Sequence, residues 1–298
     1  MKVAVLLSTY NGEKYLFEQL ESLANQTVVN SMTVYIRDDG SKDNTVDIIE
    51  QWRDKLPIVL IKGNNVGPAR SFWDLLRNEQ IQADYYAFCD QDDIWDPDKI
   101  EVGIQQLQEG YRLACCNCRI IDGNGILQQE MFRTERPDMA LTGVFVTGFV
   151  QGCAMVFTDE FRKYLCSLNL TSIPMHDTIV MMYALAGGKI CWDNTPRFSY
   201  RVHENNVTVK SKKSPVKRIQ HTWKSWKNSS KNSMSTVARE MLENHAAVSE
   251  KDKEFLRHMQ NYRNSLRDKL WLLRYKENQK AGYRVLRSYR IRLLLGLL

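Results

Sequence analysis

The sequence lacks the long apolar stretches of membrane-spanning chains. No run approaches the roughly 20 apolar residues that a helix needs to cross a bilayer. The N-terminal segment "MKVAVLLSTYNGEKY" has a single basic residue before its apolar run, which is too short for a secretory signal peptide. Repeats and low-complexity tracts are also missing from the 298 residues. We therefore expect one large or two smaller globular domains, neither secreted nor integral to a membrane.

A paired cysteine framework is also missing. The count is odd, and most of the cysteines lie inside apolar runs: Cys89, Cys115, Cys116, Cys118, Cys153, Cys166 and Cys191. This pattern favours reduced thiols in the cytosol over disulfides. The cluster at residues 115–118 has no second cluster at zinc spacing, so we interpret it as buried strand packing rather than a zinc site.

Two common nucleotide-binding fingerprints are missing as well. The sequence has no G-x-x-x-x-G-K-[ST], which excludes a P-loop, and no G-x-G-x-x-G after the first predicted strand, which a dinucleotide-binding fold would show. A nucleotide would instead have to be held by the polar segments "TYN" and "DDGS", with a metal ion bridging its diphosphate.

The first part of the sequence alternates apolar β-rich runs with segments of helical periodicity. Strands are predicted at 3–9, 32–38, 57–63 and 84–90, and helices at 13–26, 43–55, 69–80 and 97–108. In the first helix, Tyr15, Leu16, Leu20 and Leu23 fall on one face. Strands that alternate with helices of this length indicate an α/β protein with a mainly parallel sheet.

The pattern changes after residue 112. Further strands are predicted at 112–122, at 148–157 and within "RFSYRVHENN", the last ending in His203, and a buried helix with an acidic start at 175–188. From residue 214 the sequence is helical, basic and rich in Trp and Tyr. Residues 210–298 carry 22 Lys and Arg against 7 Asp and Glu, a net charge of +15, whereas residues 1–209 have a net charge of −9. We expect a boundary near residue 210, between regions with different partners.

Polar residues follow each of the first four predicted strands. These segments are "STYNGE" (8–13), "RDDGS" (37–41), "GNNVGPAR" (63–70) and "DQDD" (90–93). Parallel strands deliver such segments to one edge of the sheet, where ligands bind. Asp90 and Asp92 could offer carboxylate oxygens to Mg²⁺ or Mn²⁺, and a divalent cation would relieve their mutual repulsion. The alternative is an exposed turn in which Asp96 or Asp98 caps the next helix.

Several of these motifs together carry a resemblance to a known family. In order and spacing, "STYNGEKYLFEQLESLANQT", "IRDDGSKDNT", "NNVGPARSF", "FCDQDDIW", "QGCAMVF", "HD" and "YRVHENN" resemble the family 2 glycosyltransferases over residues 1–206. The resemblance implies the GT-A fold, in which a mainly parallel central sheet is flanked by helices and binds a nucleotide sugar. The forms "DQDDIW" and "YRVHENN" look most like bacterial rhamnosyltransferase-type enzymes of surface-polysaccharide synthesis.

The resemblance also implies roles for residues that bind the sugar donor and a metal ion, Mn²⁺ or Mg²⁺. Asp38, rather than its neighbour Asp39, would bind the pyrimidine base. Asp90 would lie near the ribose, Asp92 would be the direct metal ligand, and His203 would lie near the metal or the diphosphate, although a lone histidine after a strand is often structural. Arg201 would clamp a phosphate. The remaining nucleotide-sugar contacts would be Thr9, Tyr10, Asn11, Glu13, Asn65, Gly67 and Arg70.

The resemblance places catalysis and acceptor binding further along the chain. Asp177 matches the family's catalytic base, and His176 stands where the family usually has Glu, which leaves the role of His176 open. Without the family, a plain helix N-terminal acid is the simpler interpretation of Asp177. Gln151, Gly152 and Cys153 would line the acceptor pocket. Asp93 would contact sugar hydroxyls or cap a helix.

The implied activity is an inverting transfer of rhamnose or a hexose from a dTDP- or UDP-linked donor to a glycan or lipid-linked acceptor. One carboxylate would take the proton of the attacking hydroxyl, and the diphosphate would leave from the opposite face. Residues 1–110 would form the nucleotide-binding half and residues 111–209 the acceptor-binding half of a catalytic domain. The alternatives are a sugar-phosphate nucleotidyltransferase, whose Gly-rich, Arg-containing loop "LLSTYNGEKY" lacks, and a non-catalytic nucleotide-sugar or glycan-binding protein.

The basic region 210–298 interleaves Lys and Arg with Trp, Tyr and Leu. Three interpretations are open: helices that pack on the catalytic domain, nucleic-acid binding, and adsorption to anionic lipid. We favour peripheral membrane contact and no nucleic acid, because a lipid-linked acceptor would lie at the membrane. The expected location is the cytoplasm, at the inner face of the cell membrane.

Overall fold

The structure is a computed structural model, and it describes residues 1–137, 139–147, 151–203, 234–276 and 283–298. The chain forms two compact units. Unit 1 comprises Met1–Pro137, Val150–Ser167 and Lys189–Val209, and unit 2 comprises Asp138–Phe149, Leu168–Gly188 and Lys210–Leu298. The boundary that the sequence predicts at residue 210 lies outside the described residues.

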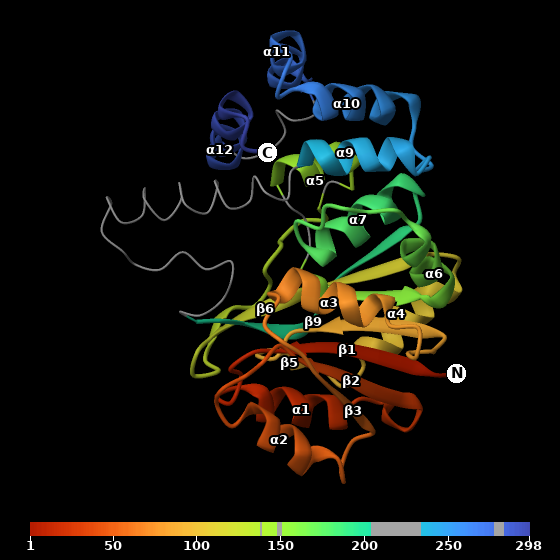
Figure 1. The fold of residues 1–298 in the computed structure, drawn as a ribbon. Helices are drawn as coiled ribbons and strands as arrows, with labels where there is room; N and C mark the ends of the chain where they lie inside the picture. Colours follow the sequence, from red (N-terminus) through yellow and green to blue (C-terminus); the bar gives the residue numbers. More distant parts are fainter. Residues whose placement is uncertain (138, 148–150, 204–233, 277–282) are drawn as a thin grey trace. The chain divides into compact units, whose positions relative to one another are not determined.

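Unit 1 is built on one sheet with the strand order β3-β2-β1-β4-β8-β6-β9-β5, and β7 pairs with β6 (Figure 1). Its strands are β1 (Val3–Thr9), β2 (Met32–Asp38), β3 (Ile58–Lys62), β4 (Tyr85–Cys89), β5 (Ile94–Trp95), β6 (Leu113–Asp122), β7 (Leu127–Gln129), β8 (Met155–Thr158) and β9 (Ile190–Val202). Its helices are α1 (Leu16–Ala24), α2 (Thr45–Trp52), α3 (Pro68–Arg77), α4 (Lys99–Gln108) and α6 (Asp159–Ser167).

The first four strands are parallel, as the alternating pattern predicts. The connections through α1 and α2 run outward to β3, and the connection through α3 runs back across the sheet to β4. Because such crossovers are right-handed, α3 covers the face opposite to α1 and α2. The four residues that the sequence places on one face of the first helix, Tyr15, Leu16, Leu20 and Leu23, are all buried.

The other half of the sheet is mixed. β8 is antiparallel to both β4 and β6, β6 is parallel to β9, and β5 pairs antiparallel with β9. The strand predicted at 148–157 begins only at Met155, because Gly152–Ala154 form a 3₁₀ turn. β9 begins earlier than predicted, at Ile190, and ends at Val202, directly before His203.

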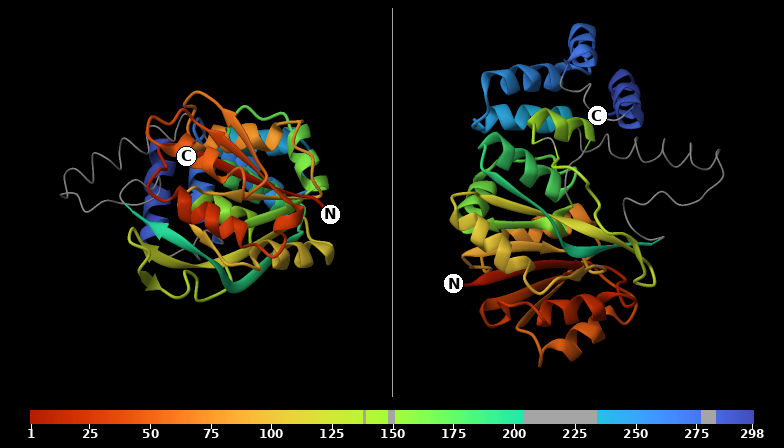
Figure 2. Two further views of the ribbon diagram at one scale, coloured as in Figure 1. Left: turned by 90° about the horizontal axis from the view of Figure 1, so that it is seen from below. Right: turned by 180° about the vertical axis from the view of Figure 1, so that it is seen from behind.

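Unit 2 is helical in its described residues (Figure 2). Its helices are α5 (Leu141–Thr147), α7 (His176–Ala186), α9 (Met234–Glu243), α10 (Glu250–Asn261), α11 (Leu266–Arg274) and α12 (Tyr283–Leu295). α7 is the helix predicted at 175–188, and seven of its 11 residues are buried. Thr171 reaches α9, where its backbone N–H donates to Glu240 at 2.8 Å. Across the described parts of the chain, no helix is both long and apolar enough to span a bilayer.

Candidate active site

The polar segments that follow β1, β2 and β4 meet at one edge of the sheet. In the parallel register, Thr9 lies opposite Asp38 at the ends of β1 and β2. On the other side of β1, Leu7 lies opposite Cys89, the last residue of β4. The sequence therefore predicts correctly that "STYNGE", "RDDGS" and "DQDD" share an edge.

The loop after β1 is tied to the neighbouring loops by hydrogen bonds. The Tyr10 N–H donates to Gln91 Oε1 at 2.9 Å, and Gln91 Nε2 donates back to the Tyr10 carbonyl at 3.2 Å. Asn11 has a φ of 48° and accepts from the Lys42 N–H at 2.9 Å. Glu13 accepts from the Asn44 N–H at 3.0 Å. Tyr10 is 43% exposed, so this loop carries an exposed aromatic residue on a hydrogen-bonded backbone.

Asp38 is buried and holds the loop after β2. Its carboxylate accepts from Thr9 Oγ1 at 3.2 Å, from the Gly40 N–H at 3.2 Å and from the Ser41 N–H and hydroxyl at 3.0 and 2.5 Å. These bonds use most of the acceptor capacity of a carboxylate. Asp38 thus shapes the loop, and a base would have to share its oxygens with these partners.

Asp39 is buried in the same way and organises the loop after β3. It forms an ion pair with Arg37, and it accepts from the backbone N–H groups of Val66 and Gly67 at 3.0 and 2.9 Å. Gly67 has a φ of 83°, a left-handed conformation that favours glycine.

Two further predicted nucleotide-sugar contacts lie in or after this loop. Asn65 is exposed. Arg70 is also largely exposed, and its Nε pairs with Asp74 one turn further along α3 at 2.7 Å.

Asp92 and His203 come together where β5 pairs with β9. His203 Nε2 lies 2.7 Å from Asp92 Oδ2, and each side chain is 12% exposed. The pairing of Ile94 with Ser199 places the end of "DQDD" beside the residues that follow β9. The His203 ring also packs against the ring of Tyr15, with 4.7 Å between the centroids.

Arg201 is buried beside this pair and binds the acidic loop. Its backbone N–H donates to Asp93 Oδ1 at 3.1 Å, and its Nε donates to the Asp92 carbonyl at 2.8 Å. A terminal guanidinium nitrogen pairs with Glu18 at 2.6 Å, and the guanidinium lies over the Tyr15 ring, 4.7 Å from its centroid. Arg201 therefore positions both Asp92 and Asp93.

Asp93 is the most deeply buried of the three acids and has no solvent exposure. Burial, followed by the charges of Asp92 and Asp90, raises the pKa of Asp93 well above its usual value. The Cys153 thiol and the Arg201 N–H act in the opposite direction on that pKa. The cluster is thus no exposed turn: Asp92 and Asp93 are buried, and Asp90 is half-buried.

The 3₁₀ turn before β8 adjoins this cluster. Gly152 and Cys153 are buried within it, and the Gln151 carbonyl accepts from the Ala154 N–H at 3.0 Å. Gln151 and Gly152 are two of the residues predicted to bind the acceptor.

Asp177 and His176 begin α7 in unit 2. Asp177 is half-buried, and its Oδ1 accepts from the Thr178 N–H at 2.6 Å. His176 is buried, and that burial lowers the pKa of its imidazole to about 3. His176 is therefore neutral at physiological pH and differs in charge from the Glu that the family usually places there.

Three residues that support the site were not predicted from the sequence. Gln91 joins the loops after β1 and β4, Arg37 pairs with Asp39, and Tyr15 packs against both Arg201 and His203. Gln91 and Arg37 lie inside or directly before the motifs "DQDD" and "RDDGS". Their positions within or beside these motifs were the sequence signal from which their role in the site could have been predicted. Tyr15 was predicted only as a core residue.

Comparison with known proteins identifies the class of protein that has this fold and site. The model of glycosyl transferase family 2 matches residues 4–165, more than half of the chain. The chain belongs to glycosyl transferase family 2, as the motifs predicted, and it is a glycosyltransferase.

The chain also resembles particular members of this class. It is 29% identical to the dTDP-rhamnosyl transferase RfbG of Shigella flexneri over 73% of this chain and 80% of RfbG. It is 30% identical to the poly(ribitol-phosphate) β-N-acetylglucosaminyltransferase TarS of Staphylococcus aureus over 55% of this chain but only 30% of TarS. Both relatives are named as enzymes that transfer a sugar and not a nucleotide, which disfavours the nucleotidyltransferase alternative.

Solved structures share the fold. Residues 1–349 of S. aureus TarS, in complex with UDP-GlcNAc, align with a TM-score of 0.61 at 20% identity, covering 98% of this chain and 89% of that one. A mannosyltransferase from Pyrobaculum calidifontis, in complex with GDP-Man and Mn²⁺, aligns with a TM-score of 0.53 at 14% identity, covering 99% and 87%. These alignments confirm the predicted GT-A architecture.

Proposed function

We propose that this chain transfers rhamnose or a hexose, with inversion, from a dTDP- or UDP-linked donor to a glycan or lipid-linked acceptor in surface-polysaccharide synthesis. The observation that carries the proposal is the Asp92–His203 pair, which joins the two family motifs "DQDD" and "YRVHENN" at the edge of the sheet. The similarity to RfbG supports a rhamnosyl donor, and the TarS complex with UDP-GlcNAc supports a UDP-linked one.

The residues at the sheet edge fit a divalent cation. The Asp92 carboxylate and the His203 imidazole are an oxygen and a nitrogen donor 2.7 Å apart, and both side chains are slightly open to solvent. Such a set suits Mn²⁺, or Mg²⁺ with more water in its shell, and Asp90 supplies a further carboxylate nearby. The bound ion would offset the charge of the leaving diphosphate.

The loops at the ends of β1, β2 and β3 would hold the nucleoside. The exposed Tyr10 ring offers a face for the base, and Asp38 keeps the surrounding loop in shape. Asp90 would bind the ribose, and Arg70 would leave Asp74 to meet the phosphates. Arg201 acts through the backbone and side chain of the acidic loop, so we propose it as a positioning residue in addition to its predicted phosphate contact. The proposed binding set is Thr9, Tyr10, Asn11, Glu13, Asp38, Asn65, Gly67, Arg70, Asp90 and Arg201.

Asp177 is the proposed catalytic base. Its carboxylate would take the proton from the acceptor hydroxyl as that oxygen attacks the anomeric carbon and the bond to the diphosphate breaks. The neutral His176 beside it adds no charge that would alter this carboxylate. Asp93, Gln151, Gly152 and His176 would bind the acceptor.

Donor turnover by wild type, Asp177→Asn and Asp92→Asn, each with Mn²⁺ and with EDTA, tests the proposal. Loss of the base is expected to lower kcat about 10²- to 10⁴-fold while sugar-donor affinity stays unchanged. Loss of the ligand is expected to lower activity about 100-fold and to weaken Mn²⁺ binding. Asp54→Asn, an exposed acid outside the site, is the matched control. Wild-type turnover that persists in EDTA and in Asp92→Asn would rule out the metal assignment.

We also propose that α11 and α12 rest on the anionic inner face of the cytoplasmic membrane. Leu266 and Leu294 are 71% and 55% exposed, and Leu270, one turn from Leu266, is also exposed. Lys269 Nζ donates to the Leu294 carbonyl at 3.5 Å, so α11 and α12 meet near these residues. Exposed arginines lie on the same helices: Arg267, Arg274, Arg287 and Arg290. Apolar side chains among cationic ones suit the surface of anionic lipid.

A further inference from the structure

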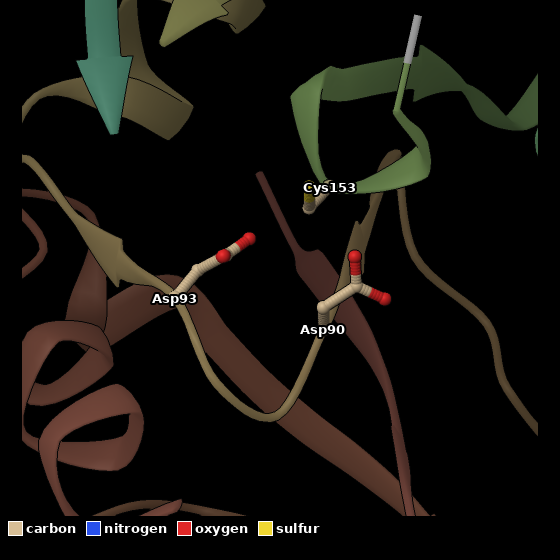
Figure 3. A group of neighbouring side chains, drawn as sticks. All are labelled: Asp90, Asp93 and Cys153. Atoms are coloured by element: carbon tan, nitrogen blue, oxygen red, sulfur yellow. The ribbon is translucent and has the colours of Figure 1, made fainter. Parts of the chain in front are cut away.

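The acidic loop and the turn before β8 bring three metal-binding side chains together. Oxygens of Asp90 and Asp93 and the sulfur of Cys153 all lie within 4.8 Å of one another, and Figure 3 shows both carboxylates on the side where Cys153 lies. The three residues come from the end of β4, the loop before β5 and the 3₁₀ turn Gly152–Ala154. Within the described part of the chain, no other group of three such residues meets the same spacing.

Asp93 is a buried carboxylate with few hydrogen-bond donors beside it, the Arg201 N–H and the weakly donating Cys153 thiol. The residue is fully buried, its Oδ1 accepts the Arg201 N–H at 3.1 Å, and its Oδ2 has no hydrogen-bond partner of ordinary geometry among the described residues. A buried carboxylate oxygen without a partner is costly, and a cation would remove that cost. An oxygen of this same carboxylate lies in the cluster with the Cys153 sulfur.

The chemistry of this cluster differs from that of the Asp92–His203 pair. Mg²⁺ and Mn²⁺ prefer oxygen and imidazole ligands, whereas thiolate sulfur selects softer ions such as Zn²⁺ and Co²⁺. We propose that Asp90, Asp93 and Cys153 form a second cation site, which takes a thiophilic divalent ion such as Zn²⁺, with water as the remaining ligand.

Small side-chain movements are enough to close the site. A sulfur at about 2.3 Å and an oxygen at about 2.1 Å from one tetrahedral Zn²⁺ are about 3.6 Å apart. The present spread of up to 4.8 Å therefore has to shrink by about 1 Å, which side-chain rotation can supply. Binding forms metal–sulfur and metal–oxygen bonds, and it releases to solvent the Cys153 thiol proton together with any proton that the Asp93 carboxyl holds; the metal keeps its oxidation state.

The second site would inhibit transfer. Asp90 belongs to both the cation site and the proposed ribose contact, so the ion and the sugar donor compete for it. This consequence, unlike the site itself, rests on the proposed function.

Co²⁺ titration of the full chain tests the site by a signal that is independent of transferase activity. A Co²⁺–thiolate bond produces charge-transfer absorption in the near ultraviolet, which carboxylates and imidazole do not. Wild type is expected to show this band and to lose it when Zn²⁺ is added. Cys153→Ser is expected to remove the band and to weaken Co²⁺ binding about tenfold or more. Cys191→Ser, a cysteine outside the cluster, is the matched control and should keep the band.

Two further measurements separate this site from the Asp92–His203 pair and guard against misfolding. The amount of Mn²⁺ bound to the protein, measured by electron paramagnetic resonance, should be equal in wild type and Cys153→Ser and lower in Asp92→Asn. Asp92→Asn should nevertheless keep the Co²⁺ band. Asp93→Asn, checked for folding by circular dichroism, should weaken Co²⁺ binding as Cys153→Ser does. The proposal would be overturned if wild type lacks the band or if the band survives Cys153→Ser. It would also be overturned if Cys153→Ser loses as much Mn²⁺ binding as Asp92→Asn does.

Discussion

The contact between Asp92 and His203 joins two residues that are distant in the sequence. They are 111 positions apart, yet His203 Nε2 lies 2.7 Å from Asp92 Oδ2. Arg201, two residues before His203, holds the backbone at Asp92 and the carboxylate at Asp93. The Asp92–His203 pair therefore depends on the buried Arg201. Loss of Arg201 would loosen Asp92 and Asp93 at the same time.

His176 carries a prediction about stability and pH. Burial lowers the pKa of its imidazole from 6.5 to about 3 in the folded protein. As the pH falls below about 6.5 the unfolded chain gains a proton there and the folded chain does not, so the free energy of unfolding falls. Between pH 6.5 and 5 this single residue should remove about 2 kcal/mol. His176→Gln should remove this part of the pH dependence.

Urea unfolding at pH 7.0 and 5.0 measures the effect. The difference in unfolding free energy between the two pH values should be about 2 kcal/mol smaller in His176→Gln than in wild type. His245→Asn is the matched control, because His245 is exposed and has a φ of 49°, which Asn tolerates. The same loss of stability between pH 7 and 5 in wild type and His176→Gln would contradict the prediction.

At the scale of elements, α10 and α11 form a small polar and aromatic assembly. Ser249 and Ser265 cap the two helices by accepting from the Asp252 and Asp268 N–H groups at 3.1 and 3.2 Å. His258 of α10 lies 2.6 Å from Asp268 of α11 and stacks on Trp271 with 4.0 Å between the ring centroids. These contacts fix α11 while its face at Leu266 and Leu270 stays exposed.

That exposed face of α11 carries a prediction about membrane binding. Replacing both Leu266 and Leu270 by Ser should weaken binding to liposomes that contain anionic lipid about tenfold or more, because two apolar side chains no longer enter the interface. Flotation of the full chain with such liposomes at low salt measures this. Val59→Ser, on the exposed β3, is the matched control. If the wild-type chain fails to float at low salt, α11 and α12 have another role.

At the scale of the whole molecule, the bound sugar donor should stabilise the fold. A ligand present at about 100 times its dissociation constant adds about 2.7 kcal/mol, which corresponds to a rise in Tm of about 5 °C in a chain of this size. We expect this rise with dTDP-rhamnose or a UDP-hexose in the presence of Mn²⁺, and a much smaller one in EDTA or with GDP- and ADP-sugars.

Thermal unfolding of the full chain against this panel measures the effect, with Asp92→Asn as the variant that should lose the dependence on Mn²⁺. An equal rise in Tm with every nucleotide sugar would contradict the proposed preference for a dTDP- or UDP-linked donor. A rise that is the same with Mn²⁺ and with EDTA would contradict the role of the metal.

The helices and strands that end at the site could be predicted from the sequence, because apolar periodicity and turn residues lie within each segment itself. β1 and β2 begin and end at the predicted residues, and β4 is one residue shorter at each end. The second half of the sheet was harder to predict, because β8 is a short strand that follows a 3₁₀ turn, and its pairing with β4 and β6 is antiparallel. A buried apolar run has no periodicity that reveals its direction or its neighbours.

The amino-acid sequence by itself determined the family, the order of the elements and the group of polar segments at one sheet edge, since motifs, periodicity and strand ends are all written along the chain. Only the tertiary structure decided that Asp92 lies against His203, that Asp38 is committed to its own loop, and that Cys153 joins Asp90 and Asp93. These contacts depend on the pairing of distant strands and on burial, which no short stretch of sequence specifies.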